Sequence, residues 1–263
     1  MIDTHCHLDQ EVYDDQESVS QVISRAFQAG VHTMICIGSG FGMASARRAV
    51  GTAAEHERVF ATVGVHPYQA DIIDEEVIER LRSLAQHPKV VAIGEMGLDY
   101  YRCTVSREKQ REGFRKQIRL AKELGLPIVI HDRETERETF QILCEEVAFQ
   151  EVGVLFHCFT GDVAYMQEIV QKGGLISIPG IITFKNAAVM REVVRNAPVS
   201  HLLLETDSPF LTPVPHRGKR NEPCYLPLIA QKVAQLQNRT VEEIERITSQ
   251  NAERFFSLPR RVV

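Results

Sequence analysis

Two histidines one residue apart stand near the start of the chain, in the run His5-Cys6-His7. In an extended strand, the side chains of residues i and i+2 point to the same face, so these two imidazoles are expected side by side. A neutral imidazole is the commonest ligand of transition metals in proteins. The pair indicates half of a metal site, although two ordinary polar residues at a strand end would give the same short pattern.

Further histidines and carboxylates recur where later apolar runs end and loops begin. Any one of them alone would more often be a buried structural residue. Together with the first pair they form a set of four imidazoles and two carboxylates: His5, His7, Glu95, His131, His157 and Asp207. These are too many ligands for one tetrahedral ion, but they suit two ions.

Such a set points to metal-assisted hydrolysis. Two cations ~3.5–4 Å apart can share a carboxylate and a hydroxide, and can clamp the attacking and leaving oxygens of a displacement. A water molecule bound to a metal reaches a pKa near ~7, so a hydroxide nucleophile is available at neutral pH. We expect Asp207 both to bind a cation and to accept a proton from the attacking water.

The elements that must position these residues follow a regular alternation. Eight short runs rich in Val and Ile are typical of strands buried on both faces. Their ranges are Ile2–Asp9, His32–Gly40, Phe60–Pro67, Val90–Asp99, Pro127–Arg133, Gly153–Gly161, Leu175–Thr183 and His201–Pro209. Amphipathic stretches lie between them, including one that ends at Gly125, one with Asp162 as its N-cap, and one that opens with a capping-box pattern at Thr240.

Eight uninterrupted strand–helix units predict a closed parallel (β/α)8 barrel, or TIM barrel, formed by residues 1–263 as a single domain. An open, doubly wound sheet is the alternative, because the number of strands alone does not establish closure. In a barrel, functional residues lie at the carboxyl ends of the strands. The metal site is therefore expected there.

Composition limits the possible partners. The 263 residues carry a net charge of −5, so no overall basic field attracts nucleic acid. The sequence has no apolar run of 18 residues, no basic and apolar leader, and no Cys-x-x-Cys pair among six scattered cysteines. We therefore expect a cytoplasmic protein with reduced thiols and without a membrane span. No obligate protein partner is evident.

The motifs resemble those of the TatD family of metal-dependent hydrolases, which are deoxyribonucleases among the amidohydrolase-like barrels. The matching segments occur in the family's order and cover most of the chain: Asp3–Asp9, Gly64–Pro67, Gly94–Tyr101, His131, His157–Gly161, Glu205–Pro213 and Arg217–Pro223. The resemblance implies that His5, His7 and Asp207 hold one ion, that His131 and His157 hold the other, and that Glu95 bridges them. Met96 stands where the family more usually has Ile.

A phosphodiester substrate also needs positive or hydrogen-bonding groups beyond the metals. The candidates that contact substrate are His66, Arg102, Arg217, Lys219 and Arg220. The last three follow the eighth strand, where barrel enzymes often bind phosphate, although a solvated charged loop would look the same. His66 could instead hydrogen-bond within the site. No aromatic-rich stacking surface is evident in the sequence.

These features favour a deoxyribonuclease that uses two divalent cations, Mg²⁺, Mn²⁺ or Zn²⁺, and acts as an exonuclease on single strands or DNA ends. Hydrolysis of an amide or ester at the same two-metal site is an alternative within the enzyme class. A non-catalytic barrel stabilised by metal is a third possibility, although structural sites are usually closed and four-coordinate.

Overall fold

A computed structural model describes residues 1–8, 19–40 and 42–259 of the chain. The chain divides into two compact units. Unit 1 comprises Met1–Ile35, Cys158–Gln171 and Leu175–Val263, and unit 2 comprises Cys36–His157 and Lys172–Gly174. Because β2 (Thr33–Gly38) begins in unit 1 and ends in unit 2, we still expect the chain to fold as one domain.

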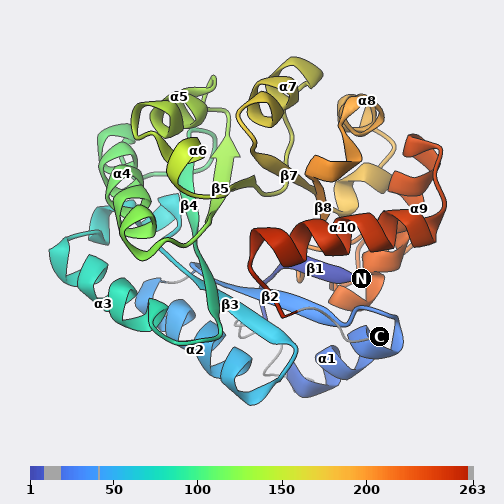
Figure 1. Ribbon diagram of the computed structural model, residues 1–263, viewed down its shortest axis with the longest axis horizontal. Coiled ribbons are helices and arrows are strands. Elements are labelled where there is room, and N and C mark those ends of the chain that lie inside the picture. Colours follow the sequence, from blue (N-terminus) through green and yellow to red (C-terminus); the bar gives the residue numbers. More distant parts are fainter. Residues whose placement is uncertain (9–18, 41, 260–263) are drawn as a thin grey trace. The chain divides into compact units, whose positions relative to one another are not determined.

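Unit 1 contains the first strand and the carboxyl-terminal third of the chain. Its strands are β1 (Ile2–Cys6), β7 (Leu175–Ile178) and β8 (Leu202–Leu204), and its α-helices are α1 (Val19–Gln28), α7 (Val163–Gln171), α8 (Ala188–Asn196), α9 (Leu226–Gln237) and α10 (Val241–Phe255). Short 3-10 helices lie at Gly180–Thr183, Val199–His201 and Pro223–Tyr225. Helices α7, α8, α9 and α10 pack on one another in succession (Figure 1).

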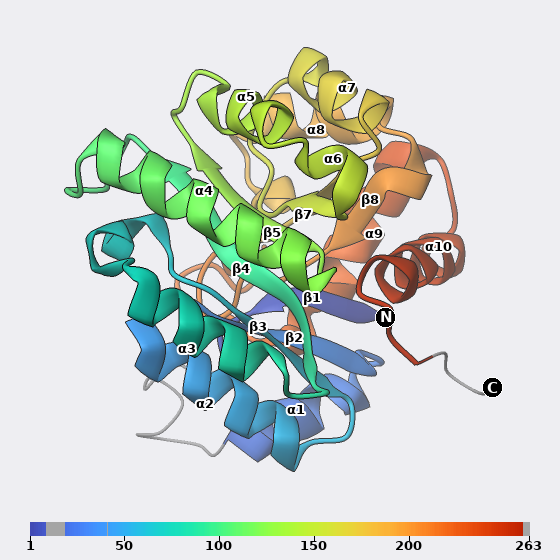
Figure 2. The same cartoon turned by 60° about the vertical axis from the view of Figure 1, so that its left-hand side comes forward.

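Unit 2 contains the central strands. Its strands are β3 (Val59–Val63), β4 (Val90–Asp99), β5 (Ile128–Arg133) and β6 (Val154–Phe156). Its helices are α2 (Gly42–Glu55), α3 (Glu75–Ala85), α4 (Arg107–Leu124), α5 (Glu138–Glu145) and α6 (Ala148–Glu151), with a 3-10 helix at Pro67–Ile72. Helices α2, α3 and α4 pack side by side against β3 and β4 (Figure 2).

The sheet has the order β1-β2-β3-β4-β5-β6-β7-β8, which is also the order of the strands along the chain. Within unit 1, Cys6 at the end of β1 forms a parallel bridge with Ser208, just beyond β8. The backbone N–H of His7 donates to the Ser208 carbonyl at 2.7 Å. The first strand thus lies beside the last, and the fold is a (β/α)8 barrel, as expected.

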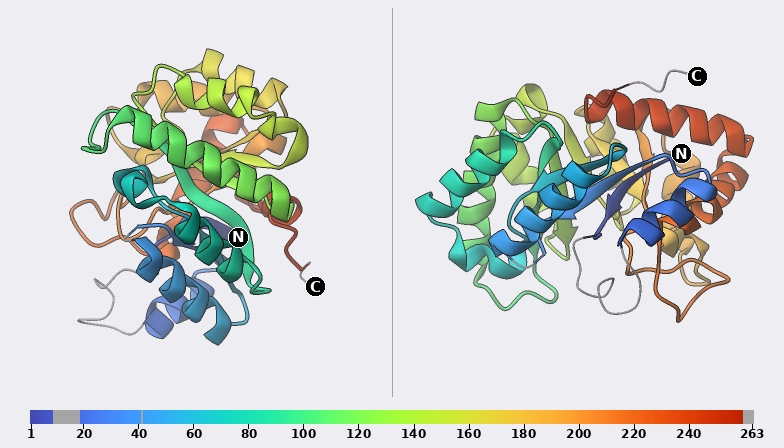
Figure 3. Two further views of the ribbon diagram at one scale, coloured as in Figure 1. Left: turned by 90° about the vertical axis from the view of Figure 1, so that its left-hand side faces the viewer. Right: turned by 90° about the horizontal axis from the view of Figure 1, so that it is seen from below.

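Local sequence signals explain where several helices begin and end. The side chain of Ser106 accepts a hydrogen bond from the N–H of Lys109 at the start of α4, and Gly125 ends this helix with a φ of 66°. Thr240 and Glu243 form the expected capping box of α10. The amino terminus donates to Glu245 of α10 at 2.9 Å, so this helix lies next to the N-terminus (Figure 3).

All eight expected strands are present, but most are shorter than the apolar runs that predicted them. Only β4 keeps its expected bounds. Strand β5 ends at Arg133 as expected, and the other six end two to five residues earlier. His7, His157 and Asp207 therefore lie in the loops after β1, β6 and β8. Asp9, the last residue of the first motif, lies outside the described residues.

Candidate metal centre

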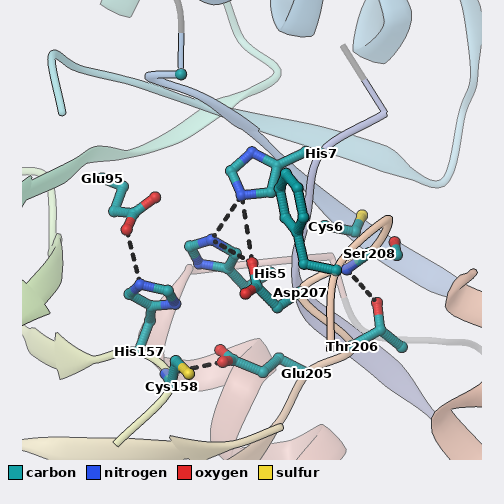
Figure 4. Close-up of polar contacts among 12 residues, drawn as sticks. His5, Cys6, His7, Glu95, His157, Cys158, Glu205, Thr206, Asp207 and Ser208 are labelled. Atoms are coloured by element: carbon teal, nitrogen blue, oxygen red, sulfur yellow. Dashed lines mark hydrogen bonds and ion pairs between the residues drawn. The ribbon is translucent and has the colours of Figure 1, made fainter. Parts of the chain in front are cut away.

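Three of the predicted ligands come together in unit 1. The Nε2 atoms of His5 and His7 are 3.3 Å apart, and Oδ1 of Asp207 lies 3.6 Å from the first and 3.3 Å from the second. Figure 4 shows the two rings and the carboxylate converging from β1 and from the loop after β8. We call these three residues the unit 1 cluster.

The spacing in this cluster fits a metal ion. Ligand atoms placed tetrahedrally at about 2.0–2.1 Å from a divalent cation are about 3.3–3.5 Å from one another. The three separations of 3.3, 3.3 and 3.6 Å match that value. All three side chains are buried or nearly so, and two imidazoles with one carboxylate are a usual donor set for such an ion.

Backbone contacts between β1 and the loop after β8 fix this cluster. The N–H of Asp207 donates to the carbonyl of His5 at 2.9 Å. Asp207 has a φ of 54°, a conformation that aspartate tolerates better than most residues. The buried Asp3 carboxylate accepts from the N–H and the hydroxyl of Thr206 at 2.9 and 2.6 Å, and burial raises the pKa of Asp3 to about 7.

Glu205 lies two residues before Asp207 and is fully buried. Its carboxylate accepts hydrogen bonds from the N–H of Cys158, at 2.7 Å, and from the hydroxyl of Ser177. Cys158 directly follows His157, so Glu205 fixes the backbone beside a predicted ligand. This agrees with a structural role for Glu205 in orienting a histidine.

The other three predicted ligands come together in unit 2, and we call Glu95, His131 and His157 the unit 2 cluster. Oε1 of Glu95 lies 2.7 Å from Nδ1 of His131 and 2.7 Å from Nε2 of His157 (Figure 4 shows the second contact). Burial alone would raise the pKa of the Glu95 carboxyl, but the nearby imidazoles of His157 and His66 hold it well below its ordinary value. An ionised carboxylate facing two imidazole nitrogens is a suitable metal ligand.

Two glycines allow β4 to carry Glu95 so close to β5. Gly97 has a φ of 146°, and a Cβ atom there would lie 2.0 Å from the carbonyl oxygen of His131. Gly94 has a φ of 139°, and its Cβ would meet the carbonyl oxygen of Val129 at 2.5 Å. Any larger side chain would therefore push the two strands apart beside the cluster.

Asp99 also belongs to this site, although it was not among the ligands predicted from the sequence. Its Oδ2 lies 3.0 Å from Nε2 of His131, the ring nitrogen opposite the one that faces Glu95. Its Oδ1 accepts from the N–H groups of Tyr101 and Arg102 at 2.9 and 2.7 Å. Burial would raise the pKa of Asp99, but the hydrogen bonds from His131 and the backbone outweigh it and lower the pKa. Asp99 therefore stays ionised.

His66 also lies in this site. Its Nδ1 accepts a hydrogen bond from the N–H of Tyr68 at 3.2 Å, so the neutral ring carries its proton on Nε2. That Nε2 lies 3.5 Å from Glu95 Oε1 and 3.3 Å from His131 Nδ1. Burial lowers the pKa of His66 and thus favours the neutral ring. Although His66, Glu95 and His131 are close enough to share an ion, the proton on Nε2 makes His66 a donor in this arrangement.

The basic residues expected to contact substrate differ in their surroundings. Arg102 is exposed on the loop after β4. Arg217 and Lys219 are exposed on the loop after β8, where the Arg217 guanidinium lies 3.7 Å from the centre of the Phe184 ring. Arg220 instead forms an ion pair with Glu222 at 3.0 Å. Among these three residues, Arg217 and Lys219 are the more accessible to a phosphate.

The chain is similar to known proteins over nearly its whole length. The family model described as TatD related DNase matches residues 2–257. An uncharacterized metal-dependent hydrolase, YabD of Bacillus subtilis, is 43% identical, with 98% of this chain and 99% of the relative covered. The 3'-5' ssDNA/RNA exonuclease TatD of Erwinia amylovora is 38% identical, with 90% and 93% covered.

Solved structures show the same likeness. The crystal structure of YJJV, a TatD homolog from Escherichia coli K12, matches with a TM-score of 0.89 and 28% identity, and the match covers 98% of each chain. The chain that contains the two ligand clusters is therefore similar to a TatD homolog over nearly its whole length.

Proposed function

The chain belongs to the TatD family of metal-dependent hydrolases, and from this premise we propose that it hydrolyses phosphodiester bonds in single-stranded nucleic acid or at DNA ends. In this proposal the unit 1 and unit 2 clusters hold two divalent cations that act on one substrate. The observation that carries the proposal is the convergence of ligand atoms within each cluster, at 3.3–3.6 Å in unit 1 and at 2.7 Å around Glu95 Oε1 in unit 2.

The barrel fold supports joint action of the two clusters. In such barrels the carboxyl ends of all eight strands face one side of the molecule, where the active site is built from the loops that follow them. His7, His157 and Asp207 follow the carboxyl ends of β1, β6 and β8, and His5, Glu95 and His131 lie in the carboxyl-terminal halves of β1, β4 and β5. This position is the one the proposed two-metal site requires.

Bound divalent cations would lower the pKa of a water molecule and neutralise charge that develops on phosphate oxygens. Asp207 would accept the proton of the attacking water through its carboxylate. His66, with its proton on Nε2, would donate a hydrogen bond to an oxygen of the reacting phosphate. Asp99 would keep the His131 ring in place through the contact at Nε2.

The choice of nucleic acid as substrate rests on two further points. One relative of this chain is named as a 3'-5' exonuclease of single-stranded DNA and RNA. Arg217 and Lys219 also leave positive charge exposed on the loop after β8, although the net charge of the chain is negative. A locally basic loop of this kind suits a few phosphate contacts rather than broad coating of a duplex.

The test is a product analysis on single-stranded and double-stranded oligonucleotides labelled at either end, with Mg²⁺, Mn²⁺ or Zn²⁺ added. We expect metal-dependent release of short products from one end of the single strand. Cleavage in EDTA would contradict the proposal. It would also be contradicted if none of the three cations supported cleavage. Asp207→Asn serves as the inactive control, because the amide cannot accept the proton of the attacking water.

A further inference from the structure

Two tyrosines of unit 2 expose their rings beside the unit 2 cluster. The Tyr101 side chain lies on the loop after β4 and is 62% exposed, and Tyr68, just after the carboxyl end of β3, is 42% exposed. The Tyr68 ring lies 4.4 Å from the His66 ring and 6.4 Å from the His131 ring, centre to centre. These exposed rings offer flat apolar faces close to the cluster that a ligand can cover.

Both tyrosines are held by one carboxylate. The Tyr68 hydroxyl donates to Asp99 Oδ2 at 3.1 Å, and the Tyr101 N–H donates to Asp99 Oδ1 at 2.9 Å. Burial and the Asp99 carboxylate raise the pKa of Tyr68 to about 12, so its hydroxyl stays a proton donor at neutral pH. The Tyr68 ring and the Tyr101 backbone are therefore held in place before any ligand arrives, which lowers the entropic cost of binding.

Positive charge surrounds the two rings. The guanidinium of Arg133 lies over the Tyr101 ring, 4.6 Å from its centre, and that of Arg102 lies 6.0 Å away. Both arginines are also near enough to the Tyr68 hydroxyl to act on its pKa. Flat aromatic faces next to guanidinium groups match a nucleotide, whose base can stack and whose phosphate is an anion.

We propose that Tyr101 and Tyr68, with Arg133 and Arg102 beside them, form a platform on which an unpaired base of the substrate stacks next to the unit 2 cluster. We call these four residues the tyrosine platform. This inference rests on the proposed function and deepens it. An unpaired base offers its face to such a platform, whereas bases inside a duplex are stacked on their neighbours, so the platform favours single strands over duplex.

The experiment compares wild type with Tyr101→Leu and Tyr101→Phe on single-stranded oligonucleotides. One oligonucleotide is intact, and others carry a single abasic analogue at each of the last few positions from the cleaved end. We measure kcat and KM for cleavage with Mn²⁺, and binding by fluorescence anisotropy with Ca²⁺. Phe27→Leu, which removes an exposed ring from α1, is the matched control.

For the intact oligonucleotide we expect Tyr101→Leu to raise KM and the dissociation constant about tenfold, with little change in kcat. Tyr101→Phe and Phe27→Leu should behave like wild type. With the abasic analogue at one position, wild type should bind as weakly as Tyr101→Leu, because the base that stacks has been removed. If Tyr101 had only a structural role, Tyr101→Leu would lower the melting temperature, and its loss of binding would not depend on the position of the abasic analogue.

The platform would be overturned if Tyr101→Leu bound the intact oligonucleotide as tightly as wild type. It would also be overturned if the loss were the same on intact and on every abasic oligonucleotide. Failure of the proposed function would give a different result. In that case wild type itself would not cleave any oligonucleotide, whichever cation was added.

Discussion

The carboxylate of Asp99 contacts Nε2 of His131 at 3.0 Å, while Nδ1 of the same ring lies 2.7 Å from Glu95. With a cation at the unit 2 cluster in place of a proton at Nδ1, the ionised Asp99 would accept the proton at Nε2, and the lone pair of the neutral ring would be left on Nδ1. His131 would thus present Nδ1 to a cation, whereas His5, His7 and His157 direct Nε2 toward their clusters. Asp99 selects which nitrogen is available.

We predict that Asp99→Asn weakens metal binding by about 10- to 100-fold, because a neutral amide no longer fixes the proton at Nε2. Isothermal titration of the metal-free chain with Mn²⁺ measures this directly. Glu112→Gln makes the same chemical change on exposed α4 and should bind Mn²⁺ like wild type. Equal affinity of Asp99→Asn and wild type would refute the role of Asp99.

A second prediction concerns the loop after β8. Replacing both Arg217 and Lys219 by Ala should weaken binding of single-stranded DNA about tenfold in dilute salt. The slope of the logarithm of the association constant against the logarithm of salt concentration should also become shallower by about 1.4, the value for two lost phosphate contacts on a single strand. Anisotropy titrations over a range of KCl give both quantities. The exposed Lys172→Ala provides a control of similar charge, and an unchanged salt dependence in the double variant would exclude this loop from substrate binding.

Arg220 should behave differently from its neighbours. Glu222 is largely buried and pairs with Arg220 at 3.0 Å and with Arg25 at 2.8 Å. Arg220→Gln should therefore lower the free energy of unfolding by about 1 kcal/mol, since it leaves the Glu222 carboxylate with one cation fewer. Urea unfolding measures this change. A variant of full stability that binds DNA poorly would instead place Arg220 among the phosphate contacts.

A fourth prediction is a pH dependence of stability at Glu146, on the connection between α5 and α6. Its carboxylate pairs with Arg115 at 3.0 Å and with Arg119 at 2.8 Å. Although burial acts in the opposite direction, these guanidinium groups lower the pKa of Glu146 below 4.5. The stabilisation is therefore present above pH 4.5 and is lost as the pH falls through the lowered pKa.

Glu146→Gln should cost about 1 kcal/mol near pH 7, and the difference from wild type should shrink as the pH falls below 4.5. Urea unfolding across this pH range measures it. Glu112→Gln, which removes more exposed pairings with Lys109 and Lys116, should cost less near pH 7. A constant difference between Glu146→Gln and wild type would show that ionisation of this group does not stabilise the fold.

The sequence predicted the barrel well because buried parallel strands and amphipathic helices leave strong periodic signals. It predicted the ligands because a histidine or carboxylate after an apolar run is a visible pattern, as at His131 and His157. The strand ends were harder to predict, since the apolar runs continue past the last ladder hydrogen bonds. Asp207 lies beyond β8 for this reason.

Other parts of the site depend on contacts between segments far apart in the chain. Asp99 shares a strand face with Glu95, at i and i+4, and this spacing was the one signal that could have marked it. The tyrosine platform joins the 3-10 helix after β3, the loop after β4 and the last residue of β5, so no local run of aromatic residues predicts it. The ion pair of Arg25 with Glu222, which also pairs with the neighbouring Arg220, is likewise hidden because Arg25 and Glu222 are far apart in the chain.

The central claim is that six side chains hold two cations that activate water for phosphodiester hydrolysis. Its most direct test is the cleavage rate of labelled single-stranded DNA by the metal-free chain as Mn²⁺ is added in molar equivalents. We predict no cleavage without metal, a rate that reaches its maximum at two equivalents per chain, and no recovery in Asp207→Asn. Cleavage by the metal-free chain, or full activity of Asp207→Asn, would contradict the claim.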